Sequence, residues 1–273
     1  MRRFLLRGDE SGLAAALELC HCLRDVQGVV ERDGELELWL EGELPALDEL
    51  SVRTVELTLP PAGPTLTGFE HDAAILVDDG LVVRPPWVAS PAGFTGLELV
   101  VPRGMAFGSG EHGSTQAALL VMTALWPSPP PARVLDVGTG SGVLALYAQR
   151  RGAAAVAACD VEVEAVAAAR ALLCSADVRL GGPAVFAGER FPFVVANLDA
   201  RQLHAALPEL LARLAPAGTL VVAGLRPTEL DAFAARVPAA PRLCRERLGY
   251  VGLGYVGLGG AELGSPEALG SGA

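Results

Sequence analysis

The sequence predicts an α/β protein in which a small ferredoxin-like α+β domain precedes a larger doubly wound domain. Two patterns predict this. Over the first 60 residues, strand and helix signals follow the order β-α-β-β-α-β. From Arg133 onward, apolar strand-like runs alternate with helix-like runs, which is typical of parallel strands joined by helices. The stretch PPAGP at 60–64 breaks regular structure between the two patterns and indicates a linker.

Each element of the first domain has its own local signal. Ser11 stands where a helix N-cap is favoured, and Asp33-Gly34 is a strong hairpin turn signal between two alternating runs. The predicted elements are a strand at 3–7, a helix at 11–23, strands at 26–32 and 35–41, a short helix at 44–50 and a strand at 52–59.

The second pattern begins after short strand signals within 65–103 and an apolar helix at 116–125, which the prolines of 126–131 end. The predicted strands are 133–138, 155–160, 193–198 and 218–225, and the predicted helices are 141–152, 163–176, 201–214 and 228–237. The pentapeptide GYVGL then occurs twice in tandem, at 249–253 and 254–258, which we interpret as a Gly-rich terminal strand pair. Residues 261–273 are expected to form a disordered tail.

Composition narrows the range of partners. The net charge of −11 argues against direct contact with nucleic acid, and no apolar run reaches the roughly 18 residues that a membrane span needs. Asp9 and Glu10 interrupt any signal-peptide core, so we expect a cytoplasmic protein, and we expect it to be a monomer. The acidic first 60 residues are compatible with a basic protein partner, although an acidic surface kept for solubility explains the same charge.

The five cysteines show neither an even count nor a regular spacing, so no disulfide framework is predicted. Cys20 and Cys22 flank His21 on a predicted helix, but residues two apart do not share a helix face. We therefore expect no metal site.

The strongest signal for chemistry is the run DVGTGSG that follows the strand at 133–138. Gly138, Gly140 and Gly142 allow a sharp turn and the close approach of a ligand, and Asp136 stands two residues before them. Asp160 ends the next strand, where a carboxylate can accept hydrogen bonds from ribose hydroxyls. A plain strand-to-helix turn, with Asp160 as a helix cap, is the alternative interpretation.

Two further features surround this turn. Asn197 ends a predicted central strand, at the edge where open α/β sheets bind ligands, and its amide offers both donors and an acceptor. The stretch GMAFGSGEHGST at 104–115 is too Gly-rich for a strand and too polar for a core. It is either an ordinary surface loop or a lid over a site, just as Asn197 is either a ligand contact or a turn residue.

Together these residues resemble the PrmA family, class I S-adenosylmethionine-dependent methyltransferases that modify a large-subunit ribosomal protein. The resemblance covers residues 81–225. Its matching features are AFGSGEHGST at 106–115, DVGTGSG at 136–142, the acidic pair Asp160 and Glu162, and the ANL that contains Asn197. The chain departs from the family pattern at Ser109 and Ser114, which keep the hydroxyl of threonine, and at Pro192, where an Asp usually opens the strand.

The resemblance implies a Rossmann-like class I methyltransferase domain and S-adenosyl-L-methionine as cofactor. It implies a domain division of 1–60 for substrate recognition, 61–103 for a linker with short strands, 104–260 for the methyltransferase and 261–273 for the tail. The implied cofactor contacts are Thr115, Asp136, Gly138, Gly140, Asp160 and Asn197; the implied catalytic residue, facing the substrate amine, is Asn197; and the implied substrate-side loop contains Phe107, Gly108 and Ser109.

The resulting hypothesis is a protein N-methyltransferase that acts on lysine and/or N-terminal amines of a basic ribosomal protein. His112 is not favoured as a general base, because methylation of an amine needs mainly a neutral nucleophile and alignment. Two alternatives remain open: a class I methyltransferase of another protein or small molecule, and a non-catalytic cofactor-binding module.

Overall fold

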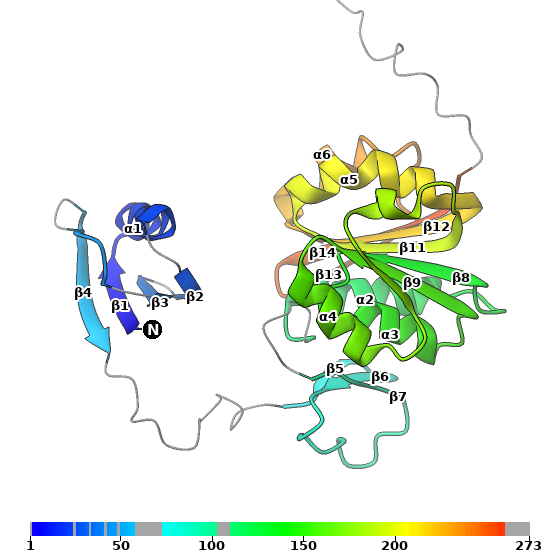
Figure 1. Cartoon of the computed structure of the whole chain (residues 1–273), viewed down its shortest axis with the longest axis horizontal. Helices are drawn as coiled ribbons and strands as arrows, with labels where there is room; N and C mark the ends of the chain where they lie inside the picture. The colour runs from blue at the N-terminus through cyan, green and yellow to red at the C-terminus, as the bar shows by residue number, and fades with distance from the viewer. Residues whose placement is uncertain are drawn as a thin grey trace, which may run out of the picture. The chain divides into compact units, whose positions relative to one another are not determined.

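The computed structural model describes residues 2–23, 26–32, 34–40, 43–47, 50–57, 73–102 and 110–259. The chain divides into two compact units, residues 1–70 and 71–273 (Figure 1). The PPAGP stretch and the expected tail at 261–273 lie outside the described residues.

The first unit contains a four-stranded antiparallel sheet and one helix. Its elements are β1 (Arg2–Gly8), α1 (Glu10–Leu23), β2 (Val26–Arg32), β3 (Glu35–Leu40) and β4 (Val52–Leu57). The strand order is β2-β3-β1-β4, so each crossover connection skips one strand, as in the predicted ferredoxin-like fold. The core lies between sheet and helix, where alternate strand residues meet one stripe of α1; its members are Phe4, Leu6, Leu13, Ala16, Cys20, Leu36, Leu38 and Leu47.

Two local predictions in this unit are wrong. The helix α1 begins after Asp9, whose carboxylate Oδ1 accepts a 2.7 Å hydrogen bond from the Gly12 amide, so Asp9 takes the place predicted for Ser11. The described residues of the 44–50 segment, 44–47 and Leu50, are not helical. Pro45 lacks an amide donor, and Leu47 is buried in the core, so packing outweighs helix propensity there.

The second unit is built on a seven-stranded sheet of order β10-β9-β8-β11-β12-β14-β13, with a separate sheet of order β5-β6-β7. Its elements are β5 (Ile75–Asp78), β6 (Leu81–Arg84), β7 (Leu97–Val100), α2 (Gly113–Leu125), β8 (Arg133–Val137), α3 (Val143–Arg150), β9 (Ala155–Asp160), α4 (Val163–Leu172), β10 (Asp177–Leu180), the 3-10 turn η2 (Pro183–Phe186), β11 (Phe191–Asn197), α5 (Ala200–Arg213), β12 (Leu214–Leu225), the 3-10 turn η3 (Pro227–Glu229), α6 (Leu230–Ala234), β13 (Leu243–Arg247) and β14 (Tyr250–Leu258).

The predicted doubly wound class is confirmed, with α2, α3 and α4 on one face of the large sheet and α5 and α6 on the other (Figure 1). Strands β8 to β12 are parallel, and both faces are covered, which is why these strands read as nearly continuous apolar runs. From β8 the chain adds strands in one direction and from β11 in the other, so the carboxyl ends of β8 and β11 border the switch point of the sheet.

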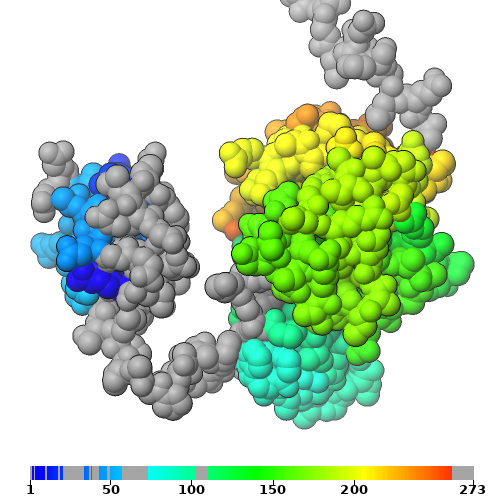
Figure 2. Space-filling view, viewed as in Figure 1, coloured from blue at the N-terminus to red at the C-terminus, as the bar shows by residue number. Residues whose placement is uncertain are grey.

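Strands β5 to β7 belong to this unit. They pack on the side of the unit that carries α2 and α3, and appear as cyan beside green in Figure 2. There Val83 and Leu99 belong to the same core as Leu119 and Leu144. Within the large sheet, Pro192 occupies a register shift between Phe191 and Phe193 at the start of β11. A residue without an amide donor fits such an irregularity.

The GYVGL repeat forms one strand, β14, rather than the predicted strand pair, and it pairs antiparallel with both β12 and β13. A five-residue repeat in a strand whose side chains alternate faces must place its two copies on opposite faces. Val251, Leu253 and Tyr255 accordingly pack into the core on the α5 side. The glycines between them face α2.

Those glycines let α2 lie directly on the strand. A Cβ added to Gly252 would lie 2.9 Å from the carbonyl oxygen of Ala117, and one added to Gly254 would lie 2.2 Å from the Leu125 Cδ1 atom. A side chain at Gly252 would push the backbone of α2 away from β14, and one at Gly254 would displace the side chains of Leu125 and Val121.

Gly252→Ala should therefore lower the free energy of unfolding by about 1–3 kcal/mol, the range for overpacking a well-packed core. The cost arises because the added methyl meets helix backbone, which cannot rotate away as a side chain can. Urea unfolding measures the change. Gly80→Ala is the matched control, since its added Cβ would meet no atom closer than 3.6 Å, and it should change stability by less than about 0.5 kcal/mol. Equal stability of the two variants would contradict this account of the helix contact.

Candidate active site

A cavity of about 750 Å³ opens at the carboxyl ends of the central strands, at the switch point of the sheet. Its lining residues come from the ends of β8, β9, β11 and β12, from the first turn of α2, from η2, from one side of α5 and from the start of β14. They include His112, Ser114, Gly138, Gly140, Asp160, Pro183, Ala184, Asn197, Gln202, Ala206, Glu209 and Tyr250.

The Gly-rich turn forms one wall of this cavity. Gly138, Gly140 and Gly142 all have positive φ angles, of 68°, 53° and 89°. A Cβ on Gly138 would lie 2.3 Å from the Leu198 Cδ2 atom, so only glycine leaves room here. The amides of Gly138 and Thr139 donate to the Cys159 carbonyl at 2.9 and 3.1 Å, which ties the turn to the end of β9.

Asp136 is fully buried below this turn and is not among the residues that line the cavity. Its Oδ2 atom accepts hydrogen bonds from the Thr139 hydroxyl at 2.7 Å and the Ala145 amide at 3.1 Å. Burial raises the pKa of this carboxyl to about 7, while those two hydrogen bonds oppose the rise. The structure thus places Asp136 where it joins the two ends of the turn, rather than at the cavity surface where the resemblance implies a cofactor contact.

Asp160 lines the cavity at the end of β9. Its Oδ2 atom accepts from the Gly140 amide at 2.9 Å, and its Oδ1 atom accepts from the Glu162 amide at 3.1 Å. The N-cap of α4 is Glu162, so Asp160 is not the helix cap of the alternative interpretation. Each carboxylate oxygen can accept a further hydrogen bond, which suits a ligand that carries hydroxyl groups.

Asn197 lines the cavity at the end of β11, and Thr115 holds its side chain. The Asn197 Nδ2 atom donates to the Thr115 hydroxyl at 3.2 Å. Thr115 is fully buried in the first turn of α2 and does not itself line the cavity. Because this bond engages the NH₂ end of the amide, it presents the Oδ1 atom as an acceptor.

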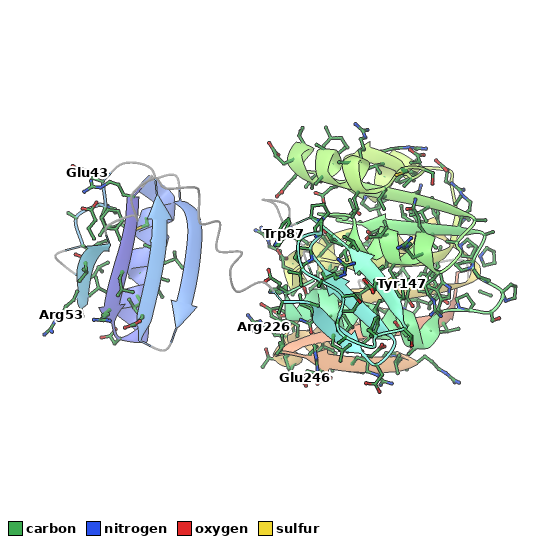
Figure 3. The ribbon with its side chains drawn as sticks, turned by 90° about the horizontal axis from the view of Figure 1, so that it is seen from below. Glu43, Arg53, Trp87, Tyr147, Arg226 and Glu246 are labelled. Atoms are coloured by element: carbon green, nitrogen blue, oxygen red, sulfur yellow. The ribbon has the colours of Figure 1, made fainter. Side chains whose placement is uncertain are left out.

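An aromatic group forms the neighbouring wall. His112 caps the N-terminus of α2, with its Nδ1 atom 2.7 Å from the Ser114 hydroxyl and 3.4 Å from the Ser114 amide, which donates to it. The His112 ring lies 4.3 Å from the Tyr250 ring, centroid to centroid, and the Arg226 guanidinium lies 4.1 Å from the Tyr250 ring centroid. Arg226 can be found at the surface in Figure 3, on the same unit as Glu246 of strand β13.

His112 favours the neutral form in this setting. Desolvation by burial lowers its pKa, and the positive charge of Arg226 lowers it further. Protonation of Nδ1 would also remove the acceptor that caps α2. The ring therefore serves as a helix cap and as part of the cavity wall.

Sequence reasoning missed several cavity residues and could not place others. Tyr250 lies within the GYVGL repeat, and Gln202, Ala206 and Glu209 lie on one side of α5; none belongs to a local motif. Phe107, Gly108 and Ser109 of the expected substrate-side loop lie outside the described residues.

The lining suits S-adenosylmethionine. Glycines with positive φ angles form the cradle beside the Asp160 carboxylate, while Val161, Pro183, Ala184 and Ala206 give an apolar end. Among the described residues no group of three metal-ligating side chains occurs. None of the helices in the described parts combines the length and apolar character that crossing a membrane requires.

Comparisons with known proteins agree with this geometry. The family model described as ribosomal protein L11 methyltransferase (PrmA) matches residues 75–239, more than half of the chain. A protein named ribosomal protein L11 methyltransferase from Syntrophotalea carbinolica is 34% identical over 220 residues, which cover 76% of this chain and 70% of that protein. One of the same name from Geotalea uraniireducens is 34% identical over 179 residues, covering 60% of this chain and 56% of that protein.

A solved structure adds the fold. The crystal structure of a ribosomal protein L11 methylase from Lactobacillus delbrueckii subsp. bulgaricus matches with a TM-score of 0.60 and 26% identity, covering 68% of this chain and 99% of that chain. The resemblance inferred from the sequence motifs is thereby confirmed. With a cavity that fits the methyl donor at the switch point of its sheet, the chain belongs to the PrmA family of S-adenosylmethionine-dependent ribosomal protein L11 methyltransferases.

Proposed function

We propose that this chain transfers methyl groups from S-adenosylmethionine to amines of ribosomal protein L11, on lysine side chains and/or at the N-terminus. The observation that carries the proposal is the single cavity in which the Gly-rich turn and Asp160 face Asn197, an amide already oriented by Thr115. The names of the relatives supply the substrate, although the matched part of the Geotalea protein is only 56% of its length.

The donor side of the cavity consists of Gly138, Gly140 and Asp160. The glycines let the amino-acid part of the cofactor approach the backbone, and Asp160 accepts hydrogen bonds from its ribose hydroxyls. S-adenosylmethionine, when bound, supplies a methyl group activated on a sulfonium. Asp136 acts indirectly, because it fixes Thr139 and the start of α3 and so holds the turn in shape.

The acceptor side centres on Asn197. Its Oδ1 atom accepts a hydrogen bond from the incoming amine and so aims the nitrogen lone pair toward the donor side. An uncharged amide does this without favouring the ammonium form, which has no lone pair to donate; a carboxylate at the same place would favour it. The apolar and aromatic walls exclude water from the amine.

The N-terminal unit recognises the protein substrate in this proposal. Its excess of acidic residues complements a basic ribosomal protein. We propose residues 1–60 for substrate recognition and 104–260 for methyl transfer, with the strands β5 to β7 of the expected 61–103 segment joined to the methyltransferase unit, whose core they share. We also propose a monomeric, cytoplasmic enzyme. The cytoplasmic location follows from the proposed substrate, which is a ribosomal protein.

Asp160→Ala should weaken S-adenosylmethionine binding by about 1.5–3 kcal/mol, or roughly 10- to 150-fold, because a charged acceptor is lost and the Gly140 amide loses its partner. Calorimetry measures the affinity. The control is Glu164→Gln, which should bind S-adenosylmethionine with wild-type affinity. Glu164 is an exposed carboxylate in the first turn of α4 and does not line the cavity. Unchanged affinity in folded Asp160→Ala would rule out the ribose role.

Asn197→Ala should lower turnover by roughly 100-fold or more, the scale expected when near-attack geometry is lost, with only a modest loss of donor affinity. Asn197→Asp should be similarly poor, because an anion favours the protonated amine. Thr115→Val keeps the shape of the buried side chain but removes the hydroxyl that orients the amide, so it should also lower turnover. Single-turnover transfer at saturating donor checks all three. A wild-type rate in Asn197→Ala would show that this residue does not position the amine.

Removal of residues 1–60 should leave donor binding intact and abolish methylation of ribosomal protein L11. The reason is that every residue lining the donor cavity lies in the second unit. Mass spectrometry of the ribosomal protein after incubation with labelled donor measures transfer. A truncated enzyme that modifies the protein at the full rate would contradict the recognition role.

A further inference from the structure

The first turn of α2 lies against the turn that joins β13 to β14. A Cβ added to Gly113 would lie 2.5 Å from the Arg247 carbonyl oxygen and 2.8 Å from the Leu248 Cβ atom. Leu248 itself has a φ of 49°, in the left-handed region that a branched aliphatic residue rarely adopts. The hairpin turn is therefore held in a defined, strained shape directly beside the helix N-terminus.

One buried amide links the two segments. The Gln116 side chain is 4% exposed and uses both ends of its amide. Its Nε2 atom donates to the Glu111 carbonyl at 2.9 Å, and its Oε1 atom accepts from the Arg247 Nε atom at 3.0 Å. Gln116 thus joins the residue just before the helix cap to the last residue of β13.

The same two segments carry the aromatic wall of the cavity. His112 follows Glu111 directly, Ser114 lies in the turn that Gln116 ends, and Tyr250 follows Arg247 by three residues. The donor side is carried by the ends of β8 and β9, and no hydrogen bond of Gln116 or Arg247 reaches it among the bonds described above.

We propose that Gln116 and Arg247 are positioning residues for the methyl-acceptor side, whose mutual hydrogen bond holds His112, Ser114 and Tyr250 in the arrangement that receives the amine. The inference rests on the proposed function for the identity of the acceptor. It goes beyond that function because it assigns acceptor geometry to a pair of residues that touch neither donor nor amine.

Comparing kcat/KM for ribosomal protein L11 with the Kd of S-adenosylmethionine separates a positioning role from general structural support. Gln116→Met fills about the volume of the glutamine side chain but makes no hydrogen bond. Arg247→Met removes the guanidinium that donates to Gln116 from the exposed side. Each should lower kcat/KM for ribosomal protein L11 by about 10- to 100-fold, as for a small misplacement of a reacting group, while the Kd of S-adenosylmethionine stays within about twofold. Arg245→Met, on the same strand and likewise exposed, is the matched control and should behave as wild type.

The double variant tests whether the two residues act through their shared bond. Gln116→Met combined with Arg247→Met should be no more impaired than Gln116→Met alone, because Gln116→Met already removes the shared bond together with the bond to the Glu111 carbonyl. Independent roles would multiply the two losses and overturn the proposal. Equal loss of donor affinity and acceptor efficiency, or no loss at all, would overturn it as well. Should Gln116→Met fail to fold, the exposed Arg247→Met still gives the comparison.

A readout without turnover keeps this inference separate from the proposed function. His112 is one of four histidines in the chain, so its ring resonances can be followed by NMR. They should shift in Arg247→Met and not in Arg245→Met, with donor binding unchanged in both. A wild-type enzyme inactive on ribosomal protein L11 would refute the proposed substrate, whereas unshifted His112 resonances in Arg247→Met would refute the positioning role.

Discussion

The direct contact between α2 and the main chain of β14 is the constraint on which the acceptor half of the cavity depends. Gly252 and Gly254 remove the side-chain layer that normally separates a helix from a sheet. The helix therefore sits close enough for Thr115, in its first turn, to reach Asn197 at the end of β11. A helix raised by the thickness of one methyl group would lengthen that 3.2 Å hydrogen bond.

The donor half depends instead on hydrogen bonds to two carboxylates. Asp136 accepts hydrogen bonds from Thr139 and Ala145. Asp160 accepts hydrogen bonds from Gly140 and Glu162. The two carboxylates together hold the Gly-rich turn in its conformation. The turn thus needs little rearrangement when a ligand arrives, and preorganisation of this kind limits the entropy lost on binding. The two halves share the cavity but are built by separate sets of contacts.

The sequence singled out Gly138, Gly140, Asp160 and Asn197, which line the cavity, and also Asp136 and Thr115, which lie buried beside it. It did not predict the hydrogen bonds between distant segments, for a physical reason. The Gly-rich turn, its preceding Asp136 and the strand-end Asp160 belong to one β-α-β unit, so local order fixes their meeting. The bonds from Thr115 to Asn197 and from Gln116 to Arg247 join distant segments that no local pattern connects. Tyr250 belongs to a five-residue repeat on a strand whose side chains alternate faces every two residues. Because five is odd, the two copies lie in different environments, and the repeat alone does not show which tyrosine faces the cavity. The helix cap at Asp9 was missed, and the helix predicted over 44–50 is absent from the described residues 44–47 and Leu50. In both places burial and local hydrogen bonding decide between conformations of similar intrinsic propensity.

The separation of 131 residues between Gln116 and Arg247 has a consequence for how the chain matures during synthesis. Chains emerge from the ribosome N-terminus first, and α2 appears long before the hairpin that holds it. The β8–β9 unit with its Gly-rich turn can assemble while translation continues, because its contacts are close in sequence. The aromatic wall cannot, since Tyr250 belongs to β14, which must emerge and pair beside β12. A nascent chain can thus form the Gly-rich turn early, whereas the aromatic wall of the cavity is complete only when β14 has paired.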